Sequence, residues 1–380
     1  MMIQLPMLWA TLLYICGILC GMEFHSWIYP FLATFILICL TLLRHRKYHF
    51  TILAMVFWFI LGCTRIGISP KPIFSKVLNE KAELIREKLH ERLKSSGITD
   101  ESLALSTALL TGEKAFLGKD TRKDYSRTGV SHILALSGMH LCIIYGVIYL
   151  LLLRWSRFSQ WRWHMLPIIL ICLWGYAFLA GMPYSLLRST IMLSVFTIGT
   201  LAQYKQPPLH TLSLSALLIL LLSPEALFDI GFQLSFTAVF FIATLYPSLR
   251  NLWREWRCQW VWNLLGVSFV AQLGTAPLSI YYFHVLPFTG FLLSLFIIPL
   301  TTLIIYIGLL TLVFPWHVFG NILDLCIKAQ TWIIQTWGDI PFLILENLYP
   351  SRRQVVLVYI LFIIYCLRTG SKTVYLYPHK

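Results

Sequence analysis

Residues 129 to 153 read GVSHILALSGMHLCIIYGVIYLLLL, a run that contains no Asp, Glu, Lys or Arg. A helix needs about 20 consecutive apolar residues to cross the hydrocarbon core of a bilayer, so this run is long enough to span a membrane. It also contains two histidines, His132 and His140, which are expensive to bury in lipid. The run therefore predicts a membrane-spanning segment, and its few polar side chains are candidates for a structural or functional role.

The composition of the whole chain agrees with this interpretation. Of its 380 residues, 58% are apolar and 12% are charged, and the mean hydropathy is +0.73. Soluble domains have about 25% charged and about 45 to 50% apolar residues. The composition therefore excludes a soluble enzyme, a disordered tail and a disulfide-stapled secreted domain. It predicts an all-α fold, a polytopic membrane helical bundle of about 10 to 12 transmembrane helices with a short helical extracytoplasmic segment.

The loops between the apolar runs differ in charge and so predict an orientation. Three short loops are rich in Lys and Arg, namely residues 44–47, 154–162 and 250–257. The alternate loops contain neither, namely residues 182–184, 223–228 and 283–289. Short basic loops stay in the cytoplasm. We therefore expect a multi-pass membrane protein with a cytoplasmic N-terminus, and orientation accounts for most of the excess in the net charge of +14, which is therefore weak evidence for nucleic acid.

Three parts are expected along the chain. Residues 1–65 should supply three N-terminal transmembrane helices, one of which starts near residue 28, and residues 66–127 a charged helical extracytoplasmic segment. Residues 128–380 should form the main transmembrane domain. An amphipathic stretch, residues 317–345, either spans the membrane or lies in its interface. The side on which Arg352 and Arg353 lie therefore stays open.

The extracytoplasmic segment, residues 66–127, is the one part of the chain that the sequence predicts to be exposed to water. Residues 76–94, KVLNEKAELIREKLHERLK, place apolar side chains at helical spacing and form an amphipathic helix that Gly97 ends. A second helix should start at Thr99 or Asp100 and run to Gly112. The segment is either a charged helical hairpin that rests on the membrane surface, or a vestibule or docking surface for a substrate on the outer face.

Polar residues within the apolar runs are the candidate functional residues. In the run quoted first they are Ser131, His132, Ser137, Gly138 and His140. Ser137 and His140 are three residues apart and could touch, whereas His132 and His140 are about 12 Å apart along a helix and cannot share a metal. These residues either make hydrogen bonds between helices or line a polar path.

A second cluster is AGMPYSLLRSTIM, residues 180–192. Gly181 and Pro183 predict a tight turn or a helix start. Arg188 follows within the next helix, and its guanidinium stays charged at any working pH. It must therefore find a carboxylate, for which Asp229 is a candidate, or carbonyls, water or an anionic substrate such as phosphate.

The third and fourth clusters each pair a glutamine with a threonine. Gln233 and Thr237 are four residues apart, and Gln272 and Thr275 are three apart, so each pair shares one face of a helix. Glutamine in a membrane helix either bonds to a neighbouring helix or lines a pore. The spacing does not distinguish these two uses.

Several motifs are missing from the sequence. There is no G-x-x-x-x-G-K-[ST] loop, no H-E-x-x-H and no clustered His and carboxylate ligands. No C-x-x-C pair occurs among the nine cysteines, which are read as small hydrophobic residues. We therefore expect neither an enzyme nor a metal site nor a cofactor.

The four clusters, in this order, resemble the competence domain of the ComEC-type DNA-internalisation family. The matching stretches are GVSHILALSGMHLCI, AGMPYSLLRSTIM, SPEALFDIGFQLSFTAVFFI and AQLGTAPLSIYYFHVLPFTGFLLSLFIIPL. The resemblance covers about residues 101 to 300. It adds Gly181, Pro183, Gly231 and Pro277 as structural motif residues and Ser235 as a further match, while Ser294 stands where the family often has asparagine. It implies a channel that passes one DNA strand across the inner membrane during transformation, without regard to base sequence.

The same resemblance implies the partners. Single-stranded DNA and the lipid bilayer come first, with a DNA-receptor protein on the outer face. Movement needs a motor, for which we hypothesise a cytosolic helicase or translocase that docks on the loops around Arg157 and Arg254. Many family members carry an OB-like domain and a metallo-β-lactamase-like domain, and nothing in this sequence resembles either. A separate nuclease is therefore expected, and the pore could form within one chain or in a homo-oligomer.

Two other classes of function stay open. A small-molecule transporter could bind an anion beside Arg188, although we find no internal repeat of the kind that many transporters have. An intramembrane serine hydrolase could use Ser137 with His140 as its base, although adjacent turns of one helix give poor geometry for attack.

Overall fold

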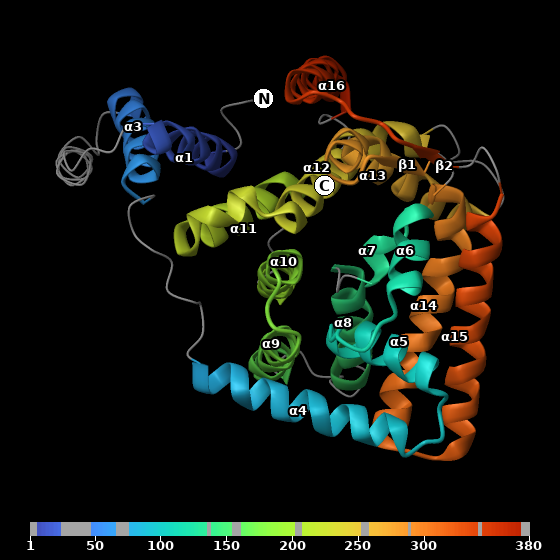
Figure 1. The fold of residues 1–380 in the computed structure, drawn as a ribbon. Coiled ribbons are helices and arrows are strands. Elements are labelled where there is room, and N and C mark those ends of the chain that lie inside the picture. The colour runs from blue at the N-terminus through green and yellow to red at the C-terminus, as the bar shows by residue number, and fades with distance from the viewer. Residues whose placement is uncertain are drawn as a thin grey trace. The chain divides into compact units, whose positions relative to one another are not determined.

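The computed structural model describes residues 6–23, 47–65, 76–134, 138–153, 161–201, 207–251, 258–287, 290–340 and 344–373. The helix predicted near residue 28, Ser137, and the loops around Arg157 and Arg254 lie outside the described residues. The chain divides into two compact units, and Figure 1 shows their elements. Unit 1 comprises residues 1–75 and 191–236, and unit 2 comprises residues 76–190 and 237–380.

Unit 1 contains α1 (Pro6–Glu23), α3 (Lys47–Arg65), α11 (Pro208–Leu222) and the 3-10 helix η2 (Pro224–Phe228). Unit 2 contains α4 (Lys76–Lys94), α5 (Asp100–Thr111), α6 (Lys119–Arg127), α7 (Ser131–Leu134), α8 (Gly138–Leu153), α9 (Trp161–Leu179), α13 (Gln259–Phe283), β1 (Val285–Pro287), α14 (Gly290–Val313), α15 (His317–Gly338), β2 (Ile344–Glu346) and α16 (Arg352–Thr373). Two helices, α10 (Tyr184–Leu201) and α12 (Ile230–Arg250), have residues in both units.

Helices make up nearly all of the described chain, and many of them are apolar. Three are long and apolar enough to cross a membrane, namely α12, α13 and α14. Shorter apolar helices lie at Met7–Gly21, Ala54–Thr64, Gly138–Leu150, His164–Leu179, Tyr184–Gly199 and Pro208–Leu222. The predicted all-α membrane fold is therefore confirmed, whereas the division at residues 65 and 127 and the cytoplasmic N-terminus stay predictions.

Unit 1 is built on a close contact between α1 and α3. A Cβ atom on Gly17 would lie 2.0 Å from the carbonyl oxygen of Phe59, and one on Gly62 would lie 2.3 Å from that of Tyr14. Gly17 and Gly21 form a G-x-x-x-G pattern, which lets membrane helices approach closely. α11 packs against α1 in the same unit, and the Thr11 hydroxyl donates to the carbonyl of Ser213 at 2.9 Å.

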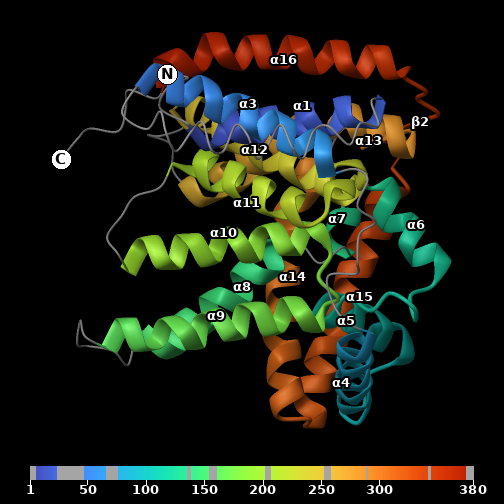
Figure 2. The same ribbon diagram turned by 90° about the vertical axis from the view of Figure 1, so that its left-hand side faces the viewer.

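The core of unit 2 forms around α14 and α15, which lie side by side in both views (Figures 1 and 2). α5 packs against both helices, and nine of its 12 residues are buried. Gly308 of α14 makes room for it, because a Cβ there would lie 2.7 Å from a methyl carbon of Leu110. The expectation that residues 66–127 are solvated throughout is therefore wrong for α5, although most side chains of α4 and α6 are exposed. α6 itself is an additional helix that the periodicity does not predict.

A short pair of strands joins the two ends of the α14–α15 region. β1 precedes α14 and β2 follows α15, and they pair antiparallel with Val285 opposite Glu346. The chain therefore leaves and returns at one place, so the segment between the strands crosses the membrane an even number of times or not at all. α15 contains the amphipathic stretch from residue 317, and it is not among the helices apolar enough to span. Residues 285–287 and 344–346 thus lie on the same side of the membrane.

Candidate functional site

The turn between α9 and α10 has the geometry that Gly181 and Pro183 predict. Gly181 has a φ of 77° and Met182 a φ of 50°, in the left-handed region that favours glycine. The N–H of Met182 donates to the carbonyl of Ala177 at 2.9 Å and thereby closes the end of α9. The carbonyl of Pro183 accepts from the N–H groups of the first turn of α10. The turn starts the helix that carries Arg188.

Arg188 lies in an unusual environment for an arginine. Its side chain is 7% exposed, and no other Lys, Arg, Asp or Glu in the described ranges is buried. Gly138, at the start of α8, packs directly against it: a Cβ at this position would lie 3.2 Å from Nη2 of Arg188 and 2.4 Å from Oγ of Ser189. Cys142, one turn further along α8, is also a neighbour of Arg188. The structure thus brings two predicted site residues, Gly138 and Arg188, into contact.

The two histidines of the first cluster lie on different helices. His140 is on α8, two residues after Gly138, and it is fully buried. His132 is on α7, where its Nδ1 lies 3.2 Å from the carbonyl oxygen of Gly129. The side chain of Ser131, like the whole of Ser137, is outside the described part of the chain, so the proposed serine–histidine contact stays a prediction.

Gln272 of α13 supports the junction between β1 and α14. Its amide nitrogen donates to the carbonyl of Pro287, and Pro287 in turn packs on Gly129, which has a φ of 79°. Gly290, at the start of α14, leaves room for Gln272 and for the carbonyl oxygen of Thr128. Pro277 lies within α13. Gln272 therefore has a structural bond in unit 2, and a role in lining a path stays a prediction.

The third cluster lies at the start of α12, with Asp229 and Gln233 in unit 1 and Thr237 in unit 2. Oδ1 of Asp229 accepts a hydrogen bond from the N–H of Phe232 at 2.8 Å, as a helix cap does. The amide of Gln233 donates to the carbonyl of Leu227 at 2.9 Å. A Cβ on Gly231 would lie 3.1 Å from Oδ1 of Asp229. Because Asp229 and Arg188 belong to different units, their predicted pairing also stays a prediction.

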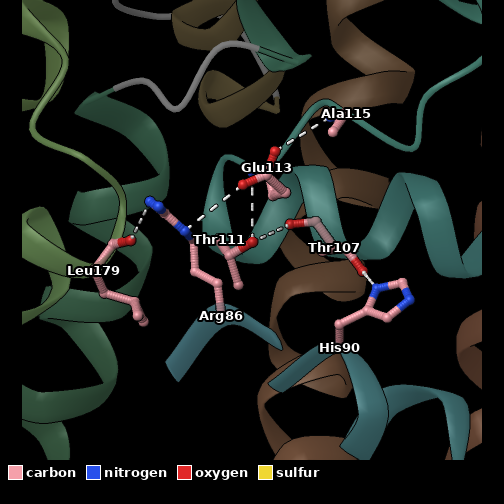
Figure 3. A network of polar contacts seen from close by, with 7 residues as sticks. All are labelled: Arg86, His90, Thr107, Thr111, Glu113, Ala115 and Leu179. Atoms are coloured by element: carbon pink, nitrogen blue, oxygen red, sulfur yellow. Dashed lines mark hydrogen bonds and ion pairs between the residues drawn. The ribbon is translucent and has the colours of Figure 1, made fainter. Parts of the chain in front are cut away.

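The sequence does not predict a network of polar contacts in unit 2 that is centred on Arg86. Arg86 of α4 forms an ion pair with Glu113, with 3.6 Å between Nε and Oε2, and its Nη1 donates to the carbonyl of Leu179 at 3.1 Å (Figure 3). Leu179 is the last residue of α9, just before the Gly181 turn. Arg86 and Glu113 are 27 positions apart on a helix and a loop, so no local spacing signals their contact. The described residues contain no group of three or more His, Cys, Asp or Glu side chains placed to hold a metal ion.

Comparison with known proteins identifies the family. The sequence profile of the family described as "Competence protein" matches residues 109–372, which is more than half of the chain. The chain belongs to the competence protein family. All the predicted site residues lie within the matched range, and α4 together with most of α5 lies before it.

Curated members and relatives of the competence family share moderate identity with the chain. ComE operon protein 3 of Bacillus subtilis is 31% identical over 219 residues, which cover 56% of this chain and 26% of the relative. Recombination protein 2 of Haemophilus influenzae is 25% identical over 276 residues, which cover 70% of this chain and 34% of the relative. An uncharacterised protein of Aquifex aeolicus is 26% identical over 283 residues, which cover 72% of this chain and 63% of the relative. The chain thus spans about a quarter to two thirds of the length of these relatives. No solved structure matches it.

Proposed function

We propose that this chain is the channel component of a DNA-uptake machinery, and that it passes single-stranded DNA across the bacterial inner membrane into the cytoplasm during natural transformation. Membership of the competence family supports a role in DNA uptake. The observation that carries the channel role is Arg188, a buried arginine on the apolar helix α10 with Gly138 of α8 against its guanidinium. A buried cation is costly unless it has an anionic partner or a hydrated surrounding.

The physics of the cargo supports the same reading. About 30 Å of hydrocarbon encloses roughly five nucleotides of an extended strand, and hence about five phosphate charges. Such charges cannot pass through a dry interior, so the path must be hydrated and supplied with donors. Arg188 provides a fixed positive charge there, and His140 and Gln272 are donors of the neutral kind. A path with few cations holds the strand weakly, as conduction requires.

The remaining parts of the proposal follow from what the chain contains. Contacts to phosphates and stacking on bases do not depend on base sequence, so transport should be indifferent to it. The chain itself performs no chemistry in this proposal. A cytosolic helicase or translocase supplies the movement, a separate nuclease removes the second strand, and a DNA-receptor protein delivers the duplex on the outer face. A homo-oligomer would enlarge the path if one chain does not enclose it.

The test compares Arg188 with an exposed arginine. Cells that express Arg188→Ala should bind labelled DNA at the surface as wild type does, but should lose uptake into the cytoplasm. Arg188→Lys keeps the charge without the planar donor group and should retain part of the uptake. Arg352→Ala, at the exposed start of α16, is the matched control and should leave uptake unchanged.

Immunoblots of the membrane fraction show whether each variant inserts at the normal level. If Arg188→Ala inserts normally and DNA still enters the cytoplasm at the wild-type rate, the channel proposal is wrong. Transport of a small anion that depends on Arg188, with DNA uptake intact, would point instead to a small-molecule transporter.

A further inference from the structure

The loop between α5 and α6 presents a small group of side chains to the outside of unit 2. Gly112 ends α5 with a φ of 79°, and the N–H of Leu117 closes a turn on the carbonyl of Lys114 at 3.1 Å. Leu117 is buried and anchors the loop, whereas Lys114 and Phe116 are exposed. The loop therefore has a fixed backbone with an exposed cation and an exposed aromatic ring.

Cations gather on this loop and on the first turns of α6. The guanidinium of Arg122 donates to the carbonyl oxygen of Lys114, which holds the two positive side chains close together. Partial burial and the charge of Arg122 both lower the pKa of Lys114. Lys119 lies three residues before Arg122, on the same face of α6. In the part of the chain that the structure describes, neither Lys114 nor Arg122 has a carboxylate at ion-pair distance. Bringing an anion here would relieve the repulsion between like charges.

Phe116 adds a stacking surface beside these cations. Its ring is 56% exposed and stacks on the ring of His90, with 4.6 Å between centroids and 21° between planes. Nδ1 of His90 lies 3.0 Å from Oγ1 of Thr107, a contact that fixes the orientation of the imidazole (Figure 3). One face of Phe116 is therefore backed by His90, and the other face is available to a planar ligand.

We propose that Lys114, Phe116, Lys119 and Arg122 form a loading surface, which binds two or three phosphates and stacks one base of a single DNA strand before the strand enters the membrane. This inference rests on the proposed function and names the first contact of its substrate. Exposed aromatic rings stack on any base, and cations bind the phosphates between them. A duplex does not fit as well, because its bases are already stacked on one another.

The loading surface is connected to the turn that precedes Arg188. Glu113, next to Lys114 in the chain, pairs with Arg86, and Arg86 reaches the carbonyl of Leu179 (Figure 3). Nη1 of Arg86 also lies within 3.5 Å of the position that a Cβ on Gly181 would take. The loop that would bind the strand is thus fixed to the end of α9, nine residues before Arg188 in the sequence. A strand held on the loop would start near the turn that leads to the buried arginine.

The test measures binding of a fluorescent 20-nucleotide poly-dT strand to the full chain in nanodiscs of zwitterionic lipid. Phe116→Leu should weaken binding about tenfold, because one stacked base is lost, and Phe116→Trp should restore it. Lys114→Gln combined with Lys119→Gln should weaken binding and reduce the dependence of log Kd on log salt by about 0.7 for each cation removed. This pair leaves Arg122 and its contact to the loop in place. The matched control is Lys81→Gln with Lys88→Gln, which removes two exposed cations from α4.

The outcomes separate this inference from the proposed function. Wild-type affinity in Phe116→Leu, or an equal loss in the α4 control pair, overturns the loading surface while the Arg188 experiment still decides the channel. Equal loss of affinity for duplex and single strand in Phe116→Leu also counts against it, because stacking on an unpaired base is the claim. A loss confined to the single strand, restored by Phe116→Trp, supports it.

Discussion

Arg86 and Arg188 both lie in unit 2, but their surroundings differ. Arg86 is partly exposed, and its guanidinium is committed to a carboxylate and a carbonyl of the same chain, Glu113 and Leu179. Arg188 is buried, and Gly138 of α8 packs against its guanidinium. An exposed ion pair contributes little to stability, whereas a buried arginine among apolar helices is expensive. The comparison teaches that the partly exposed Arg86–Glu113 pair serves to hold its segment together, whereas Arg188 is the buried charge whose removal should affect passage.

The largest expected effect comes from the contact that encloses Arg188. Gly138→Leu places a side chain where Ser189 and Arg188 now lie, and overpacking of this kind costs about 1–3 kcal/mol. We expect DNA uptake to fall on the order of tenfold to a hundredfold, measured as cytoplasmic labelled DNA normalised to the amount of inserted protein.

A compensating pair shows whether the contact itself is responsible. Gly138→Ala should reduce uptake less than Gly138→Leu, and Ser189→Ala should partly rescue it, because the closest contact of the new Cβ is the Ser189 hydroxyl at 2.4 Å. Gly146→Ala is the control on the same helix, since no atom lies within 4 Å of a Cβ there. An additive double mutant, with no rescue, would show that α8 and α10 do not pack in this way.

An intermediate effect is expected from the contact that holds α15 to the turn between α4 and α5. Asp324 accepts from Thr99 at 2.5 Å and lies 2.6 Å from the ammonium of Lys328. Burial acts to raise the pKa of Asp324, but the hydrogen bonds from Lys328, Thr99 and Ser102 outweigh it and lower the pKa from 3.8 to about 2. The carboxylate therefore stabilises the fold above pH 3.8, and this stability is lost as the pH falls toward 2.

Thermal unfolding of the purified protein in detergent, followed between pH 6 and pH 2, measures this contribution. A shift of this size corresponds to about 2 kcal/mol, and Asp324→Asn should remove the part of the pH dependence that lies between pH 4 and 2. Asp339→Asn, at the exposed end of α15, should leave that part unchanged. Identical acid sensitivity in wild type and Asp324→Asn would mean that the carboxylate does not anchor α15.

The sequence predicts the membrane helices and the turn before Arg188, but it does not predict which helices are buried by contacts with distant parts of the chain. Long apolar runs predict membrane helices because backbone groups in lipid must bond within their own helix. The turn at Gly181 and Pro183 is local and was predictable too. The burial of α5 was not predictable from the sequence. Its residues LALSTALL are compatible both with a helix on the membrane surface and with a helix inside the protein, and the contacts with α14 and α15 determine that it is buried. The same is true of Ser189 opposite Gly138.

The smallest effects are expected from the Arg86–Glu113 pair. Glu113→Gln should reduce the free energy of unfolding by about 0.5–1 kcal/mol, since the two side chains are 20% and 31% exposed and solvent screens them. Arg86→Ala should cost about 1 kcal/mol more, because the carbonyl of Leu179 also loses its donor. A charge-swapped double mutant, Arg86→Glu with Glu113→Arg, should recover the pair but not the bond to Leu179. It should therefore be no more stable than Glu113→Gln.

Uptake of DNA should change by less than about twofold in Glu113→Gln, as expected of a pair with a structural role. If uptake instead fell as far as in Arg188→Ala at normal protein level, the distinction between structural and functional charge in unit 2 would be lost, because a weak surface pair would then control passage.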